Sequence, residues 1–581
     1  MYLNVSKRDG RRKYLSIQKS FWNKETKSRT STTIMSLGFL DVLEKEFDDP
    51  ISHFKELAKT MTVQENETRH ILIDIDMNEE LPDNARGTYN FGYAVPMKIY
   101  HDLLLDDFFK RKMVGKKFDY NTNSIMIMLT MSRILAPASK KKSYEDKGRF
   151  FERFDFSLDD VNNSLLHYAE VSTELQQSMH ERITSKYGSD TGIVYYDVTN
   201  YYFQIDEPDE KKKNAKSKGN QKKVIIQMGL VMDADGVPIH YKLFPGNTLD
   251  KETFRSVIGD IKLNYNTGRV IVVADMGSIT GDNIYYLTDS KQEKPLNGYV
   301  FSISVHGSTD KFKEYVLDRN GYCDINGKPV GEDADFMIKS RIEERDINVS
   351  MSDGEKITKQ VNEKQVVFWN RKYYNKARAD RAEVLAKAEK LIKSPSAYTK
   401  ATSYGASAYV LNIDYDKKTG EIKGKGGKAL LLDSVKIAEQ EKLDGYHCII
   451  TSELDMTDNQ IIDIYLGRWD IEKTFKITKS ALFARPVHVK ANENIDAHFF
   501  ICFISLVIIR LIQKKMDKNY SAAKIIECLN KIECIQEHEN IYLFGYKSEL
   551  SVALGKAFNI DFSKKRLPLN KIKQILADVK K

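Results

Sequence analysis

The spacing of apolar residues changes along the chain, and each change marks a new group of expected elements. Short alternating segments at 13–18 and 32–38 predict strands, and helical spacing follows at 49–61. From 96 to 188 the spacing stays helical, with a strongly apolar stretch at 125–135. A small sheet with a helix, followed by an all-α segment, is therefore expected in the first third of the chain.

From residue 190 the pattern alternates between strands and helices. Runs rich in β-branched and aromatic residues predict strands, and amphipathic stretches predict helices. The expected order is strand, strand, strand, helix, strand, helix, at 192–203, 223–232, 237–244, 250–264, 269–275 and 280–290. Three hairpin strands followed by a crossover helix is the order of an RNase H-like fold, in which the first and fourth strands are neighbours. The predicted fold class is α/β with an RNase H-like mixed sheet.

Two aspartates lie in unusual places in these strands. Asp197 interrupts an apolar strand, where aspartate is depleted, and Asp275 ends a short buried strand. The reason for Asp197 could be structural or chemical. Asp275 could be a turn or cap residue, but strand ends are also where sites are built. The neighbouring first and fourth strands would bring Asp197 beside Asp275.

Four functional side chains share one face of an expected helix further along the chain. Tyr465, Arg468, Glu472 and Lys479 fall within about 60° of one another at about 100° per residue. A surface helix with an Arg468–Glu472 ion pair would give the same pattern. A carboxylate flanked by cations also suits a helix that binds a metal through its acid and a phosphate through its neighbours.

Together, Asp197, Asp275 and the Tyr-x2-Arg-x3-Glu-x6-Lys pattern resemble the DDE transposases of bacterial insertion sequences that carry the YREK signature. Segments 446–452, 479–486 and 244–248 also resemble the family. Met276 departs from it, since a small or basic residue is commoner after the second aspartate.

The resemblance implies that the chain binds terminal inverted repeats and target DNA and catalyses strand cleavage and transfer. Asp197, Asp275 and Glu472 would bind two Mg²⁺ or Mn²⁺ ions, and Tyr465, Arg468 and Lys479 would grip phosphates. A homodimer would hold two ends in a synaptic complex. A nuclease without strand transfer and an inactive DNA-binding descendant are the main alternatives. A coiled-coil or scaffold protein is the least favoured alternative, because no sustained heptads occur.

Charge supports a polyanionic partner. The net charge is +8, and the first 29 residues hold nine Lys or Arg, including Arg11 and Arg12, against two acids. Aromatic residues are interleaved with them, which is typical of nucleic-acid binding. Lys211, Lys212 and Lys213 lie in a basic loop that either guides DNA or is disordered.

Residues 276–471 separate Asp275 from Glu472, which is far more than one crossover needs, so a β-rich insertion is expected. Strand-like pieces occur at 336–342, 364–369 and 408–413, and an Ala-rich helix at 376–393. Trp369 in this insertion could stack on an extruded base or pack the insertion's own core.

The predicted domains are a basic α+β domain (1–65), a helical DNA-binding domain (66–188), the first core part (189–305), the β-rich insertion (306–444), the second core part with the signature helix (445–515) and a helical C-terminal region (516–581). Five cysteines without metal spacing indicate neither a zinc site nor disulfides. The apolar run 499–512 is too short to span a bilayer, so we expect a core helix and a cytoplasmic, nucleoid-associated protein without membrane contact.

Overall fold

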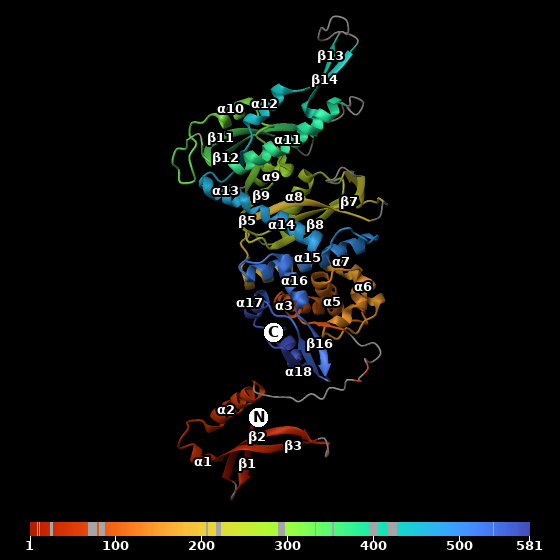
Figure 1. Ribbon diagram of the computed structural model, residues 1–581, viewed down its shortest axis with the longest axis vertical. Coiled ribbons are helices and arrows are strands. Elements are labelled where there is room, and N and C mark those ends of the chain that lie inside the picture. Colours follow the sequence, from red (N-terminus) through yellow and green to blue (C-terminus); the bar gives the residue numbers. More distant parts are fainter. Residues whose placement is uncertain are drawn as a thin grey trace. The chain divides into compact units, whose positions relative to one another are not determined.

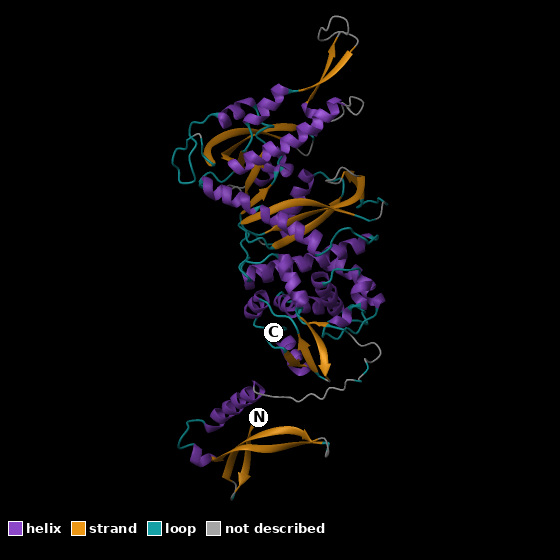
Figure 2. Cartoon of the chain, viewed as in Figure 1, coloured by secondary structure: helices purple, strands orange, loops and turns teal. Residues whose placement is uncertain are grey.

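The computed structural model of the chain is drawn in Figures 1 and 2. It describes all residues except 9, 11, 24–26, 68–77, 79, 81–86, 205–206, 217–221, 266, 289–296, 332, 351–353, 394–404, 416–426 and 539. The chain forms two compact units, Met1–Ala85 and Arg86–Lys581, and each is described by itself.

The smaller unit is a three-stranded antiparallel sheet with helices on one side. Its strands, in the order β1-β2-β3, are β1 (Tyr2–Arg8), β2 (Arg12–Asn23) and β3 (Ser28–Phe39), and its helices are α1 (Leu40–Leu43) and α2 (Pro50–Glu67). Leu15 from β2 packs with Leu43 and Phe54 in the core. The strands and the helix expected in this region are therefore confirmed.

A nine-stranded mixed sheet is the centre of the larger unit (Figure 2). Its order is β11-β12-β15-β10-β9-β5-β7-β6, and β8 also pairs with β7. The strands are β5 (Ile193–Tyr202), β6 (Lys213–Lys216), β7 (Lys222–Met232), β8 (Pro238–Pro245), β9 (Val270–Ala274), β10 (Asn297–Ile303), β11 (Phe336–Ser350), β12 (Lys356–Asn370) and β15 (Tyr446–Thr451).

The first and fourth predicted strands are neighbours, as expected. The helix α8 (Asp250–Asn264) connects β8 to β9, and α9 (Gly281–Thr288) follows β9. The strands β5 and β9 pair in parallel with an offset of 78 residues, because Ile193 lies opposite Ile271 and Tyr195 opposite Val273. The same offset, continued past the end of β9, places Asp275 level with Asp197.

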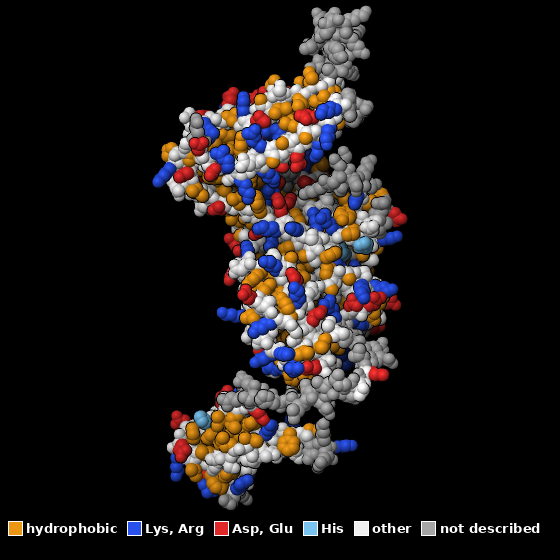
Figure 3. Space-filling model, in the orientation of Figure 1, with side chains coloured by type: hydrophobic (Ala, Val, Ile, Leu, Met, Phe, Trp, Pro, Cys, Tyr) orange, Lys and Arg blue, Asp and Glu red, His pale blue; other side chains and the backbone are white. Residues whose placement is uncertain are grey.

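The expected insertion extends the main sheet, since β12 pairs with both β11 and β15. The two strands β11 and β12 are much longer than the predicted pieces, because each continues into a hairpin arm with alternating exposure. Other elements here are α10 (Asp310–Leu317), α11 (Arg371–Lys393), β13 (Val410–Tyr415), β14 (Gly427–Leu432) and α12 (Ser434–Lys442). Figure 3 shows Lys and Arg side chains along α11, mixed with acids and apolar groups. The expected Ala-rich helix at 376–393 is part of α11.

Helices before and after the sheet share one core. They are α3 (Ala94–Asp102), α4 (Leu105–Met113), α5 (Thr122–Leu135), α6 (Lys140–Glu145), α7 (Leu158–Tyr187), α15 (Asn492–Lys515), α16 (Ala522–Lys531), α17 (Glu549–Phe558) and α18 (Leu569–Asp578). The helix α15 packs against α3, α5 and α7. The expected helical segment at 96–188 is thus confirmed, and its apolar face is buried by the C-terminal third of the chain.

The C-terminal region 516–581, expected to be helical, contains three helices and also strands among its described residues. A four-stranded sheet lies there, formed by β16 (Glu533–His538), β17 (Ile541–Phe544), β18 (Arg566–Pro568) and the distant β4 (Tyr89–Asn90). The strands are short, so local alternation gives little signal, and β4 contributes only through long-range pairing with β16.

The predicted apolar core helix is α15. It is long and apolar enough to cross a membrane, but 94% of its apolar window is buried inside the protein. One such helix is weak grounds for a membrane span, because the core helix of a globular protein passes the same test.

Candidate functional site

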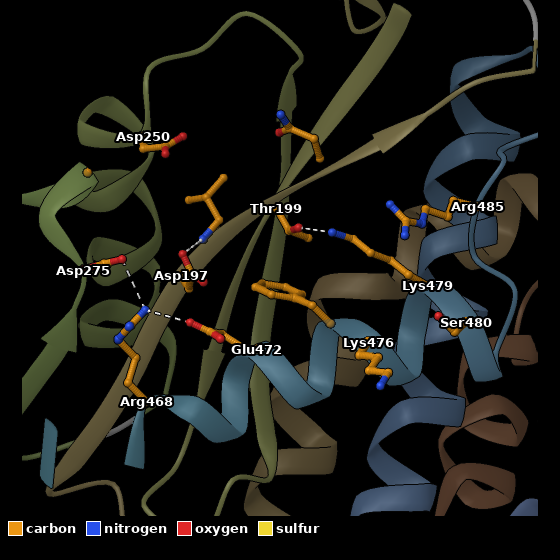
Figure 4. A pocket seen from close by; sticks show the side chains of 14 residues that line it. Asp197, Thr199, Asp250, Asp275, Arg468, Glu472, Lys476, Lys479, Ser480 and Arg485 are labelled. Atoms are coloured by element: carbon orange, nitrogen blue, oxygen red, sulfur yellow. Dashed lines mark hydrogen bonds and ion pairs between the residues drawn. The ribbon is translucent and has the colours of Figure 1, made fainter. Parts of the chain in front are cut away.

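The two aspartates and the signature helix line one cavity of about 520 Å³ (Figure 4). Its wall is formed by β5, the start of α8, the turn after β9, and the helix α14 (Trp469–Lys476) with the π-helical turn Ile477–Ala481 that follows. The lining residues are Asp197, Val198, Thr199, Asn200, Asp250, Asp275, Gly277, Arg468, Glu472, Phe475, Lys476, Lys479, Ser480 and Arg485.

Arg468 joins two of the predicted acids. Its Nη1 lies 3.3 Å from Asp275 Oδ2 and 3.2 Å from Glu472 Oε1. Asp275 also accepts a hydrogen bond from Ser302, at 3.0 Å. Asp197, on β5, accepts one from the backbone N–H of Val198 at 2.8 Å. The structure therefore brings all three predicted carboxylates to one cavity, with a guanidinium between two of them.

The electrostatics of Arg468 reflect this position. Burial disfavours its charge, but the Tyr465 hydroxyl and the carboxylates Asp275, Glu472 and Asp197 outweigh burial and raise the pKa of the guanidinium. Its Nε–H is buried and has no hydrogen-bond partner among the described residues.

The carboxylates suit a hard divalent cation in their donor chemistry, because oxygen ligands select Mg²⁺ and Mn²⁺. Among the described residues, however, no three His, Cys, Asp or Glu side chains are close enough to share one ion. In this arrangement Asp275 and Glu472 are paired with Arg468 instead. The donor set fits such an ion, while its present geometry is that of ion pairs.

The spacing of the signature residues predicted one continuous helix, but the structure divides this segment. The helix α13 (Asp458–Gly467) ends just before Arg468, which is its C-cap, and α14 begins just after Arg468. The π-helical turn that follows α14 contains Lys479. A Cβ atom on Gly467 would lie 2.1 Å from the Tyr195 hydroxyl, so only glycine lets the break approach β5 this closely. Arg468, Glu472 and Lys479 still reach the cavity. Tyr465 is buried, 9% exposed, with Arg468 above its ring, and does not line the cavity.

Cationic side chains gather at the other end of the cavity (Figure 4). Lys479 donates a hydrogen bond to Thr199, which lies two residues after Asp197 on the same strand. Arg485 lies over the ring of Tyr202, 5.7 Å from its centroid. Acids, with Arg468 between two of them, thus line one end of the cavity, and Lys476, Lys479 and Arg485 line the other.

A family model described as "Transposase DDE domain" matches residues 194–508, more than half of the 581-residue chain. The chain belongs to this family. The matched span contains Asp197, Asp275 and Glu472, and the protein is therefore a DDE transposase by family. No curated protein matches the chain.

Solved transposase structures also match, with low similarity. A piggyBac transposase synaptic complex with hairpin DNA covers 86% of this chain and 87% of its own at 7% identity and a TM-score of 0.32. Two Mos1 structures, a paired-end complex with the left transposon end and a mariner paired-end complex with Mn, each cover 38% of this chain and 60% of their own. Both have 14% identity and a TM-score of 0.10. These scores are too low to show a shared fold.

Sequence reasoning missed three charged residues of the transposase cavity. Lys476 had a signal, because it lies four residues after Glu472 and hence on the same helical face. Asp250 begins α8, where an acid is usual at a helix N-terminus, so its pattern indicated nothing else. Arg485 lies in an irregular segment, whose position only the folded chain defines.

Lys211, Lys212 and Lys213 do not line the cavity. Lys211 pairs with Asp496 at 2.8 Å, at the start of α15. Lys212 is buried and donates to the Lys490 carbonyl at 2.9 Å, and Lys213 begins β6. Two of the three cations thus contact the segment around the start of α15.

The remaining predicted DNA-binding residues lie outside the cavity. The Trp369 indole N–H donates to the Asp444 carbonyl at 2.8 Å, and the ring packs on Tyr374, as the core-packing alternative expects. Arg12 donates two hydrogen bonds to Asp41, at 3.0 and 2.6 Å. Arg11 lies outside the described residues.

Proposed function

We propose that this chain is the transposase of a bacterial insertion sequence of the YREK type, which binds the terminal inverted repeats of its element and cleaves and joins DNA strands there. The observation that carries this proposal is the divided cavity. Carboxylates at one end suit the reacting phosphodiester, and cations at the other suit neighbouring phosphates of the same strand.

Asp197, Asp275 and Glu472 would hold two Mg²⁺ or Mn²⁺ ions. Such a pair activates the attacking oxygen and stabilises the leaving one in phosphodiester chemistry. Arg468 contributes a guanidinium that neutralises Asp275 and Glu472. Lys479, positioned by Thr199, adds a second cation. No side chain needs to attack the phosphate, which separates this proposal from tyrosine and serine recombinases.

The strand arrangement supports an RNase H-like assignment for the core. Three antiparallel strands, β8, β7 and β5, are followed by the parallel β9 and β10 in space. The domain boundaries predicted from the sequence, end recognition by the region before residue 190, a cytoplasmic location, and a homodimer that holds two ends belong to the same proposal.

The test uses a supercoiled plasmid carrying the coding region and its flanking DNA, incubated with the purified full-length protein. We expect Mg²⁺-dependent cleavage at the element's ends and joining to a second plasmid, and loss of both on chelation with EDTA. Cleavage without joined products would favour a nuclease without strand transfer. End binding without cleavage in Mg²⁺ or Mn²⁺ would favour an inactive DNA-binding descendant.

Lys479→Ala should weaken binding of a pre-cut end by roughly tenfold and reduce the salt dependence of binding by about one counterion, because it removes one phosphate contact. Fluorescence anisotropy across a salt series measures both. Lys473→Ala is the matched control, since Lys473 lies on the adjacent α14 but pairs with Asp470 at 2.9 Å and does not line the cavity. Equal effects of the two substitutions would show that Lys479 has no special role.

A further inference from the structure

The sheet of the smaller unit has one face that its helices leave uncovered. Leu15 and Ile17 of β2 are fully buried on the helical side. Since neighbours along a strand point to opposite sides, Tyr14, Gln18 and Trp22 point to the other side. Within the described residues of this unit, no helix packs on that open face.

Polar contacts cross all three strands on the open face. The Tyr2 hydroxyl donates to Gln18 Oε1 at 3.0 Å, and Ser31 on β3 donates to the same oxygen at 3.2 Å. Arg29 donates to the Ser20 hydroxyl at 2.9 Å. Amide and hydroxyl groups therefore form a row across the centre of this face, held in place by one another.

Arginines and aromatic rings flank this row. The guanidinium of Arg8 lies 4.6 Å from the ring centroid of Tyr14, and that of Arg12 lies 4.1 Å from that of Phe39. The three strands contain six Lys or Arg and no Asp or Glu. The acids of this unit lie on its helices and connecting segments, so the sheet carries the positive charge.

We propose that the open face binds in the major groove of duplex DNA, with Gln18 directed to base edges and Arg8 and Arg29 to phosphates. Three strands span about 10 Å at a spacing of about 4.8 Å, which suits a groove about 12 Å wide. Amide groups read base edges there, and guanidinium groups bind phosphates. The source of that DNA, the ends of the element, rests on the proposed function.

A duplex fits this face better than a single strand does. Binding of single strands requires free aromatic faces on which bases stack. On this sheet, the guanidinium groups of Arg8 and Arg12 already cover the rings of Tyr14 and Phe39. Trp22, 64% exposed at the end of β2, and Tyr2, 42% exposed at the start of β1, are the open-face rings left for such stacking among the strand residues described.

The test uses the full-length chain and a 30-bp duplex selected by that chain from a randomised pool, with binding measured by anisotropy at moderate salt. Arg29→Glu and Arg8→Glu should each weaken binding about tenfold or more. Lys13→Glu is the matched control, because Lys13 carries the same charge on the same sheet but alternates to the helical side. It should change binding by less than about threefold.

Base reading has its own measurement. Gln18→Ala should lower the preference for the selected duplex over an unrelated one by about tenfold, with affinity for the unrelated duplex unchanged. Methylation of guanine N7, which lies in the major groove, should interfere with binding of the wild-type chain. Thermal melting identifies any variant that fails to fold. If one of the two arginine variants does not fold, the other still tests the inference.

Equal losses in Arg29→Glu and Lys13→Glu would overturn the inference in favour of diffuse attraction. Tighter binding of a single strand than of the duplex would overturn it in favour of base stacking on Trp22 or Tyr2. The plasmid assay separates this inference from the proposed function. Normal cleavage and joining, with unimpaired binding by the open-face variants, refutes only the inference. Tight binding by a wild-type chain that never cleaves, with impaired binding by the open-face variants, refutes only the proposed function.

Discussion

Glu472→Gln, Asp275→Asn and Asp197→Asn should each reduce strand cleavage by about 10³-fold or more, which corresponds to about 4 kcal/mol of lost transition-state stabilisation. Each substitution removes one anionic oxygen donor from the acidic end of the cavity while preserving side-chain volume. Binding of an uncut end should change little, because phosphates are gripped by the cations. Cleavage rates on a labelled end duplex, together with Mn²⁺ binding followed by electron paramagnetic resonance, measure the effect.

Asp470→Asn is the control for this series. Asp470 lies on α14 two residues before Glu472 and pairs with Lys473 outside the cavity. Its substitution by Asn removes one negative charge, as the three site substitutions do. It should retain cleavage and Mn²⁺ binding. A Glu472→Gln variant that cleaves and binds Mn²⁺ as Asp470→Asn does would remove Glu472 from the proposed metal site and leave it as the ion-pair partner of Arg468.

The sequence predicted those parts of the site that lie on regular elements. Asp197 and Asp275 could be placed together because strand order follows from hairpins and a crossover helix, and the observed β5–β9 register agrees. Helical periodicity likewise placed Glu472 and Lys479 on one face, although a break at Arg468 and a π-helical turn interrupt the helix. Despite these interruptions, Arg468, Glu472 and Lys479 all line the cavity.

The other features could not be predicted from the sequence, because they depend on contacts between residues far apart in the chain. The strand β4 has two residues and pairs with β16 more than 400 positions later, so no local pattern could predict the C-terminal sheet. Lys211 and Lys212 looked like a solvated basic run, but their partners, Asp496 and the Lys490 carbonyl, are also remote in sequence. A run of charged residues predicts an exposed segment. Only the folded structure shows which of its side chains have partners within the protein.

The largest effect on stability is expected from a buried ion pair in the insertion. Two guanidinium N–H groups of Arg381, on α11, donate to the two carboxylate oxygens of Asp444, and both side chains are buried. Asp444→Asn would leave the Arg381 charge buried with a neutral partner, and Glu441, at 4.0 Å, compensates only in part. We expect destabilisation by about 3 kcal/mol or more, seen as a lower melting temperature.

A second ion pair, which also joins an arginine of α11 to an aspartate outside that helix, is the control for this prediction. Asp335 pairs with Arg371 at 3.3 Å, and both side chains are exposed, so Asp335→Asn should leave the melting temperature nearly unchanged. The double variant Arg381→Met with Asp444→Asn should recover part of the loss, because it removes the unpaired charge. If Asp444→Asn melts like Asp335→Asn, the pair is solvated in solution and does not hold α11 against the sheet.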